Sequence, residues 1–468
     1  MVDLFAPIPT LAQALRSGET TATDLARIAL ERLDTHGRSL NAVVTLTEEQ
    51  ALREAALADA ELAAGVDRGP LHGIPWGAKD LIAVPGYPTT WGSAPYRDQT
   101  FDEEAFVVTR LRAAGAVLVA KLAMVEIAGG MGYGQPNASF TGPCMTPWNT
   151  DGWSGGSSSG SGSAVGAGAV GFALGSETWG SIVSPAANCG VSGLRPTYGR
   201  VSRRGAMALS WTLDKLGPLA HSANDCGLIL AAIAGRDPGD DTSADRPFTW
   251  NASTPAMRRS TGFRFGVLHD AGKNVQPEVA ANFNASLDVL REFGTLEEVT
   301  LPDFPYNEAA GAIVQAELSS AFEDLLLSGD VQQLTAPEDR VRGLISLAIP
   351  AHVYLRAMRI RRLIARTMDE VMAPYDAIVS PTMQTVASPI DRNFEAYFSR
   401  SERSPIGAAA NLSGLPGIAI PNGFGQRGLP TSLLFTGRAW DEHTVLSAAT
   451  AYQQHTDWHT RQPDLSNL

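Results

Sequence analysis

Cysteine is scarce in this chain. Its 468 residues include only three cysteines, Cys144, Cys189 and Cys226, and no two of them form a Cys-x-x-Cys pair. An odd, widely spaced set of this kind argues against a disulfide-stabilised scaffold and against a cysteine-based zinc site. We therefore expect no metal site, and a reducing, cytoplasmic compartment.

Long apolar runs and positive charge are also lacking. No apolar stretch approaches the roughly 18 residues that a membrane span needs, and the first residues lack the basic and apolar regions of a signal peptide. The net charge of −13 argues against nucleic acid or an anionic membrane as a main partner, since both bind basic surfaces. Apolar residues make up 44% of the chain, which is enough for a sizeable core.

The chain is long enough for two or three ordinary domains or for one large α/β unit. A helix over 103–115 followed by a buried strand over 115–121 favours an α/β sheet, and no clear linker interrupts the sequence. We expect one domain over 1–468 that contains a helical middle section over 225–370. Apolar spacing also predicts helices over 21–33, 48–64, 351–372 and 441–455, and strands over 263–268, 375–381 and 417–421.

Residues 154–163 have the composition of a flexible Gly/Ser linker. They run directly into the small apolar residues 164–174, which belong in a packed interior, so we interpret the stretch as backbone that closely approaches a substrate carbonyl. It ends a long loop over 128–163, and loops of that length are usually functional. A Gly-x-Ser-x-Gly nucleophile elbow is disfavoured because no buried strand precedes it, and a phosphate-binding loop lacks the required spacing.

Lys79 is flanked by apolar and small residues in Leu71-His-Gly-Ile-Pro-Trp-Gly-Ala-Lys-Asp80. Burial in such a pocket disfavours the ammonium form and lowers the lysine pKa. A neutral lysine can act as a general base for a nearby serine hydroxyl.

Several motifs, in order along the chain, resemble the amidase signature family of Ser–cisSer–Lys hydrolases. The longest is 155–200, and the lysine segment 71–80 precedes it. Cys189–Ser202, Asn411–Pro416 with Gly428–Pro430, and Ala451–His459 are similar to further blocks of the family. The resemblance covers essentially the whole chain. It implies an α/β fold with a single large mixed β-sheet core surrounded by helices.

The resemblance assigns roles to three residues. Ser181 is the implied nucleophile, Ser157 the bridging serine that follows a cis peptide bond, and Lys79 the base. Ser158 is the alternative bridge if the register is shifted by one residue. The implied oxyanion hole consists of the backbone N–H groups of Thr178, Trp179, Gly180 and Ser181, and no cofactor is required.

Around the nucleophile this sequence departs from the commonest family version, Asp-Thr-Gly-Gly-Ser-Ile-Arg. Here Glu177 replaces the aspartate, Trp179 replaces a glycine and Val183 replaces the arginine. Glu177 then needs another partner, for which the loop itself is a candidate. Trp153 and Trp179 either form aromatic walls that favour aryl groups or simply pack in the core.

For the acyl pocket we expect residues from 128–134 and from 315–319. The candidates are Gly129, Gly130, Met131, Tyr133 and Trp153. The predicted activity is hydrolysis of linear amide C–N bonds through an acyl-enzyme on Ser181, with aryl amides or carbamates as the small-molecule substrates. Two alternatives remain: the glutaminase subunit of a tRNA-dependent amidotransferase, and a non-catalytic scaffold relative.

Overall fold

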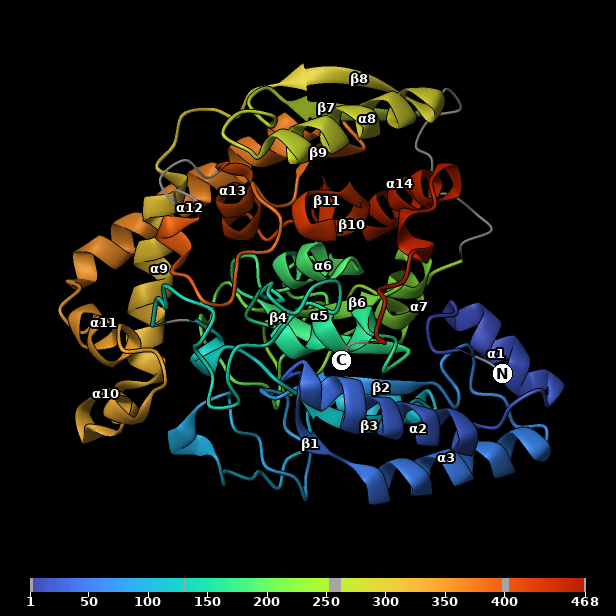
Figure 1. Cartoon of the computed structure of the whole chain (residues 1–468). Helices are drawn as coiled ribbons and strands as arrows, with labels where there is room; N and C mark the ends of the chain where they lie inside the picture. The colour runs from blue at the N-terminus through green and yellow to red at the C-terminus, as the bar shows by residue number, and fades with distance from the viewer. Residues whose placement is uncertain (1–2, 130, 252–261, 398–403, 467–468) are drawn as a thin grey trace.

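One mixed β-sheet runs through the whole molecule in the computed structural model (Figure 1), which describes residues 3–129, 131–251, 262–397 and 404–466. Its strand order is β1-β3-β2-β4-β6-β5-β10-β11-β9-β7-β8. The strands are β1 Val43–Leu46, β2 Pro75–Lys79, β3 Val117–Leu122, β4 Phe172–Glu177, β5 Ser192–Arg195, β6 Lys215–Ala220, β7 Phe263–Leu268, β8 Gly294–Val299, β9 Ala377–Pro381, β10 Gly417–Phe424 and β11 Pro430–Thr436. The predicted α/β fold with a single large mixed sheet is confirmed.

Helices surround this sheet, and those close in sequence gather in the same region (Figure 1). They are α1 Ile8–Ser17, α2 Ala22–Arg32, α3 Glu48–Ala63, α4 Phe106–Ala113, α5 Ser159–Gly166, α6 Val183–Cys189, α7 Ala223–Ile233, α8 Pro277–Phe293, α9 Tyr306–Ala321, α10 Glu323–Ser328, α11 Asp339–Ser346, α12 Ala351–Met372, α13 Ile406–Leu412 and α14 Glu442–His455. Among the described residues, no helix is both long and apolar enough to cross a membrane.

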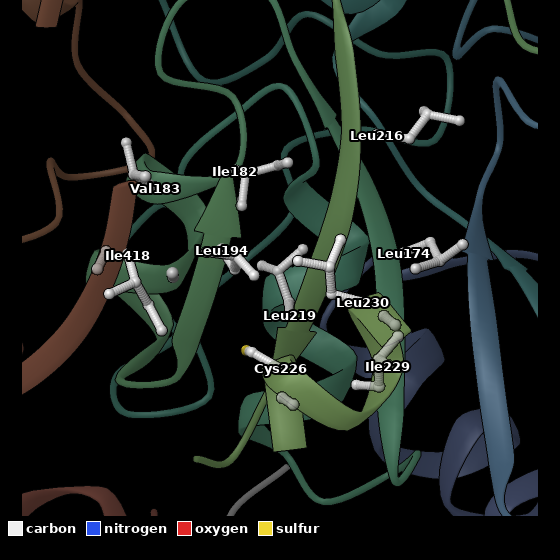
Figure 2. Packing of buried hydrophobic residues seen from close by; sticks show 14 of the residues in the cluster. Leu174, Ile182, Val183, Leu194, Leu216, Leu219, Cys226, Ile229, Leu230 and Ile418 are labelled. Atoms are coloured by element: carbon white, nitrogen blue, oxygen red, sulfur yellow. The ribbon is translucent and has the colours of Figure 1, made fainter. Parts of the chain in front are cut away.

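The central strands are buried along their entire length. Every residue of β2, β3, β4 and β6 is buried, because helices cover both faces of the sheet there. Figure 2 shows leucine and isoleucine side chains of β4, β5, β6 and α7 converging into one cluster, with Leu174, Leu219 and Ile229 among them. Burial of this apolar surface is the main stabilising contribution to folding.

The order of the strands determines where the site lies. β2 runs parallel to β3 and β4, whereas β4 runs antiparallel to β6. The carboxyl ends of β2 and β4 therefore meet at the same edge of the sheet, and these ends carry Lys79 and Glu177. This edge brings together two motifs that lie almost a hundred residues apart in sequence.

The Gly/Ser stretch is more ordered than its composition predicts. Residues 128–163 were expected to be mostly loop, but α5 begins at Ser159. All eight residues of α5 are buried, and Gly160 lies so close to the backbone of Ala123 that a Cβ atom would clash. Tertiary packing thus forms a helix from residues that disfavour helices when isolated.

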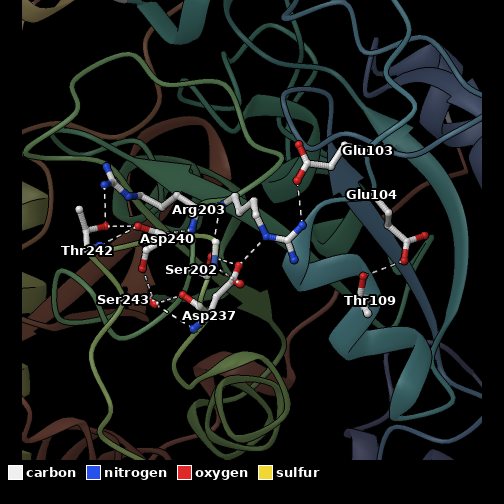
Figure 3. A network of polar contacts seen from close by, with 11 residues as sticks. Glu103, Glu104, Thr109, Ser202, Arg203, Asp237, Asp240, Thr242 and Ser243 are labelled. Atoms are coloured by element: carbon white, nitrogen blue, oxygen red, sulfur yellow. Dashed lines mark hydrogen bonds and ion pairs between the residues drawn. The ribbon is translucent and has the colours of Figure 1, made fainter.

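A polar network ties the segment after β5 to the rest of the molecule (Figure 3). The Arg204 guanidinium contacts both Glu103 and Asp237 at 2.8 Å. Ser202 donates to the same Asp237 carboxylate at 2.8 Å. The network connects the segment before α4 with the loop that follows α7.

Candidate active site

Lys79 is the last residue of β2, and its side chain is fully buried. Its Nζ atom donates to Ser157 Oγ at 2.7 Å and to Ser176 Oγ at 2.9 Å. Burial lowers the pKa of this amine to about 7, although the charges of Asp214 and Glu177 oppose the shift. The neutral form of this lysine is therefore accessible near neutral pH.

Ser157 follows the cis peptide bond from Gly156, and it lies directly before α5. The backbone N–H of Ser158 donates to the Ser181 carbonyl at 3.2 Å, which fixes the two serine segments against each other. The Ser158 hydroxyl bonds the backbone carbonyl and N–H of Ser176. Lys79 thus contacts Ser157, whereas the Ser158 hydroxyl hydrogen-bonds the backbone of β4.

Ser181 lies just before α6, and 9% of its surface is accessible, within the wall of a large cavity. Among the described residues, no acceptor is found for the backbone N–H groups of Thr178, Trp179, Gly180 and Ser181. Gly180 has φ +94°, a conformation that residues other than glycine rarely adopt. Four unpaired donors at a cavity wall are an arrangement that can stabilise an oxyanion.

Glu177 is paired with an arginine, although Val183 stands where the family version has one. Its Oε1 atom accepts from Arg195 Nη1 at 2.8 Å, and its Oε2 atom accepts from the backbone N–H groups of Ile182 and Val183 at 2.9 and 3.1 Å. Burial disfavours the carboxylate, but the charges of Arg195 and Lys215 outweigh it and lower the Glu177 pKa to about 2. An arginine from β5 and the loop itself thus replace the partner missing at Val183.

Two contacts at this site had not been predicted from the sequence. Ser176 is the second hydroxyl on Lys79, and Asp214 accepts from Thr178 Oγ1 at 2.5 Å and from two backbone N–H groups. Burial raises the Asp214 pKa despite these bonds. The sequence held one signal for Ser176. Successive side chains of a strand point to opposite faces of the sheet, so Ser176 had to lie on the face opposite to that of Glu177.

The cavity beside Ser181 has a volume of about 640 Å³. One wall is aromatic: the rings of Trp153 and Phe394 have centroids 4.7 Å apart, and those of Tyr133 and Phe394 lie 5.6 Å apart. Trp179 and Val183 line the cavity next to the serine. Both tryptophans therefore line the cavity rather than only filling the core.

The pocket predictions have mixed outcomes. Gly129, Tyr133 and Trp153 line the cavity, and Gly130 lies outside the described residues. Met131 was wrongly predicted: it is fully buried in the hydrophobic core, where its sulfur lies against Gly343. Left-handed backbone at Ile127 and Ala128 turns the chain just before this residue.

Of the predicted stretch 315–319, Gln315 lines the cavity. Its neighbour Val314 and Gly311, one helical turn earlier, line it too. Ser319 is buried away from the cavity and donates to the Ala316 carbonyl. Ser319 shares the helix face of Gln315 but lies one turn further along α9, where it no longer lines the cavity.

The family model for Amidase matches residues 24–446. The chain belongs to this family. The resemblance to amidase signature enzymes is therefore confirmed, and the protein is an enzyme of the class that hydrolyses amide C–N bonds.

Several relatives match the amidase over nearly its full length. A glutamyl-tRNA(Gln) amidotransferase subunit from Roseiflexus sp. (strain RS-1) is 39% identical over 480 residues, which cover 97% of each chain. The structure of native peptide amidase from Stenotrophomonas maltophilia superposes with a TM-score of 0.88 at 31% identity, covering 99% of each chain. The corresponding amidotransferase subunit from Thermotoga maritima has a TM-score of 0.76 at 29% identity, covering 92% of this amidase and 91% of that chain.

Proposed function

We propose that this amidase forms an acyl-enzyme on Ser181, with Ser157 as the proton bridge and Lys79 as the base. The observation that carries the proposal is the buried Lys79–Ser157 hydrogen bond of 2.7 Å, made by an amine whose pKa is about 7. A base poised near neutral pH can accept a proton and release it again.

The steps conserve protons. Neutral Lys79 takes the Ser157 hydroxyl proton while Ser157 takes that of Ser181, and Ser181 Oγ attacks the amide carbonyl carbon. The N–H groups of Thr178, Trp179, Gly180 and Ser181 would hold the resulting oxyanion. Collapse breaks the C–N bond as the relay returns the proton to the leaving amine, and water then cleaves the acyl-enzyme by the same route.

Aryl amides and aryl carbamates are the substrates that we propose. The wall formed by Tyr133, Trp153 and Phe394 offers ring faces and edges to a substrate ring, and a cavity of about 640 Å³ can hold one. A carbamate carbonyl forms the same tetrahedral intermediate as an amide carbonyl. Val183 supports this choice because it presents an apolar surface beside the nucleophile.

The comparisons favour a second candidate, the glutaminase subunit of an amidotransferase. Its support is the 39% identity to an amidotransferase subunit over 97% of the chain. Free glutamine carries an ammonium and a carboxylate that a site must neutralise. Among the described cavity residues, the charged side chains are already paired: Arg195 with Glu177, and Lys273 with Asp270. This pairing is why we place aryl substrates first.

The test is a panel containing a p-nitroanilide with a short acyl chain, an aryl carbamate, glutamine and a primary aliphatic amide. Ser181→Ala and Lys79→Ala should each lower kcat/KM by more than about 10³-fold, because the relay acts as a unit. Ser388→Ala removes another buried cavity hydroxyl and should retain wild-type rates. Cleavage of glutamine alone would favour the amidotransferase candidate. Failure of a fluorophosphonate to label Ser181 would favour a scaffold.

A further inference from the structure

Exposed apolar side chains concentrate in one region of the molecule. Eleven large apolar residues are exposed in the described part of the chain, and eight of them lie on or next to α10, α11 and α12: Leu327, Val341, Leu344, Ile345, Leu347, Val353, Leu355 and Leu363. Ile345 and Leu355 are 67% and 59% accessible. Such a concentration on one part of the surface is typical of an interaction site.

The same region has an unusual charge. Residues 340–368 contain seven arginines and no acidic residue, in a chain whose net charge is −13. Four of these arginines are exposed on α12 and make no ion pair or hydrogen bond with any described residue: Arg356, Arg359, Arg362 and Arg366. Elsewhere on the surface arginines are commonly paired, as Arg16 is with Asp67.

On α12, arginines and exposed leucines share a face. Leu355, Arg359, Arg362 and Arg366 recur at spacings of three or four, which places them on one side of α12, and Leu363 lies among them. The opposite side of α12 is buried through Ala357, Ile364 and Met368. We call the exposed side chains of 341–366 the arginine-rich face; α11 and α12, which carry it, lie on the left-hand flank in Figure 1.

We propose that the arginine-rich face binds the surface of an anionic lipid membrane. Arginine pairs with lipid phosphates through its guanidinium while its aliphatic stem, like leucine, enters the apolar boundary. The excess of arginine over acidic residues in 340–368 complements the negative charge of such a surface. The whole-chain charge of −13 predicted no membrane partner, because it averages over this local excess of arginine.

The experiment is co-sedimentation of the full chain with vesicles of phosphatidylcholine alone or mixed with phosphatidylglycerol. We expect saturable binding only to the anionic vesicles, weakening as salt increases. Arg356→Glu/Arg359→Glu/Arg362→Glu should lower the partition coefficient at least about 100-fold, since each arginine near such a surface contributes roughly a factor of five. Ile345→Ser/Leu355→Ser should weaken binding without changing its salt dependence.

The matched control reverses three exposed arginines elsewhere. Arg27→Glu/Arg53→Glu/Arg461→Glu changes the net charge by the same amount and should bind nearly like the wild type. Equal loss in both triple variants would mean that only net charge matters, which would overturn the proposal. Absence of binding by the wild type would overturn it too.

A dimer in sedimentation velocity that Ile345→Ser/Leu355→Ser abolishes would identify the face as a protein interface instead. None of these variants touches the cavity, so hydrolysis should be unchanged.

Discussion

At the scale of single residues, the proposed mechanism makes the activity depend on the protonation state of Lys79. Its pKa of about 7 lies below the ordinary 10.5, and the base works only when neutral. We expect kcat/KM to rise with pH through about 7 and then level off, and to fall as acid protonates the amine. The measurement is a pH profile of kcat/KM with the aryl amide.

Lys215 also has a pKa of about 7 because of burial, so the profile alone does not identify the group. Lys79→Ala should recover activity when methylamine is added, in proportion to the unprotonated amine, because a small base can occupy the vacated space. Ser181→Ala should not recover. Rescue of both variants, or of neither, would contradict the role of Lys79 as the base.

Ser176 is predicted to position Lys79. Removing its 2.9 Å hydrogen bond with Ser176→Ala should lower kcat about 2- to 10-fold with little change in KM, the effect expected for one hydrogen bond. Ser176→Thr keeps the hydroxyl and serves as the matched variant. An unchanged kcat in Ser176→Ala would show that Ser157 alone orients the amine.

At the scale of elements, the turn from β4 into α6 depends on a buried ion pair. Arg195→Leu leaves the buried Glu177 carboxylate without its charge partner, which should cost about 3–5 kcal/mol of unfolding free energy. Adding Glu177→Gln should recover part of that loss, since it removes the unpaired charge. Urea unfolding of the two variants measures the difference.

The same pair has a defined pH window. The Glu177 pKa falls from 4.5 to about 2 on folding, so its stabilisation is fully present above about 4.5 and is lost as the pH falls towards 2. The wild type should therefore lose more stability over that range than Glu177→Gln does. Parallel acid unfolding curves for both proteins would contradict this assignment.

A substitution at Gly180 tests the turn that carries the proposed oxyanion-binding N–H groups. No atom lies within 4 Å of a Cβ placed on it, so Gly180→Ala is penalised by its φ of +94° and not by a clash. We expect a cost of about 1–2 kcal/mol in the turn, which appears as a lower kcat or as lower stability. Gly428→Ala, also at positive φ in open space but not among the residues that line the cavity, is the control, and should leave kcat unchanged.

The sequence predicted the elements in which apolar residues recur at regular spacing. It failed where contacts between segments distant in the sequence determine the structure. The helix over 351–372 was predicted with the bounds that the structure has, because its apolar spacing is regular. α5 was not, because burial against Ala123 and Pro185 stabilises a Gly/Ser helix that has little propensity of its own. Arg195 as the partner of Glu177 depends on the neighbouring order of β4, β6 and β5, which a single sequence does not reveal.

At the scale of the whole molecule, the continuous sheet predicts one cooperative unfolding unit. The main hydrophobic cluster extends from Leu4 to Tyr452, and β5 joins the two halves of the sheet by pairing with both β6 and β10. Domains that share no core can melt separately, whereas parts of one core lose their packing together.

Thermal unfolding followed by far-ultraviolet circular dichroism and by tryptophan fluorescence should give coincident midpoints. Leu194→Ala, a fully buried change in the joining strand, should lower both midpoints equally. Two separated transitions, or a shift in one midpoint alone, would show that 1–468 is more than one domain.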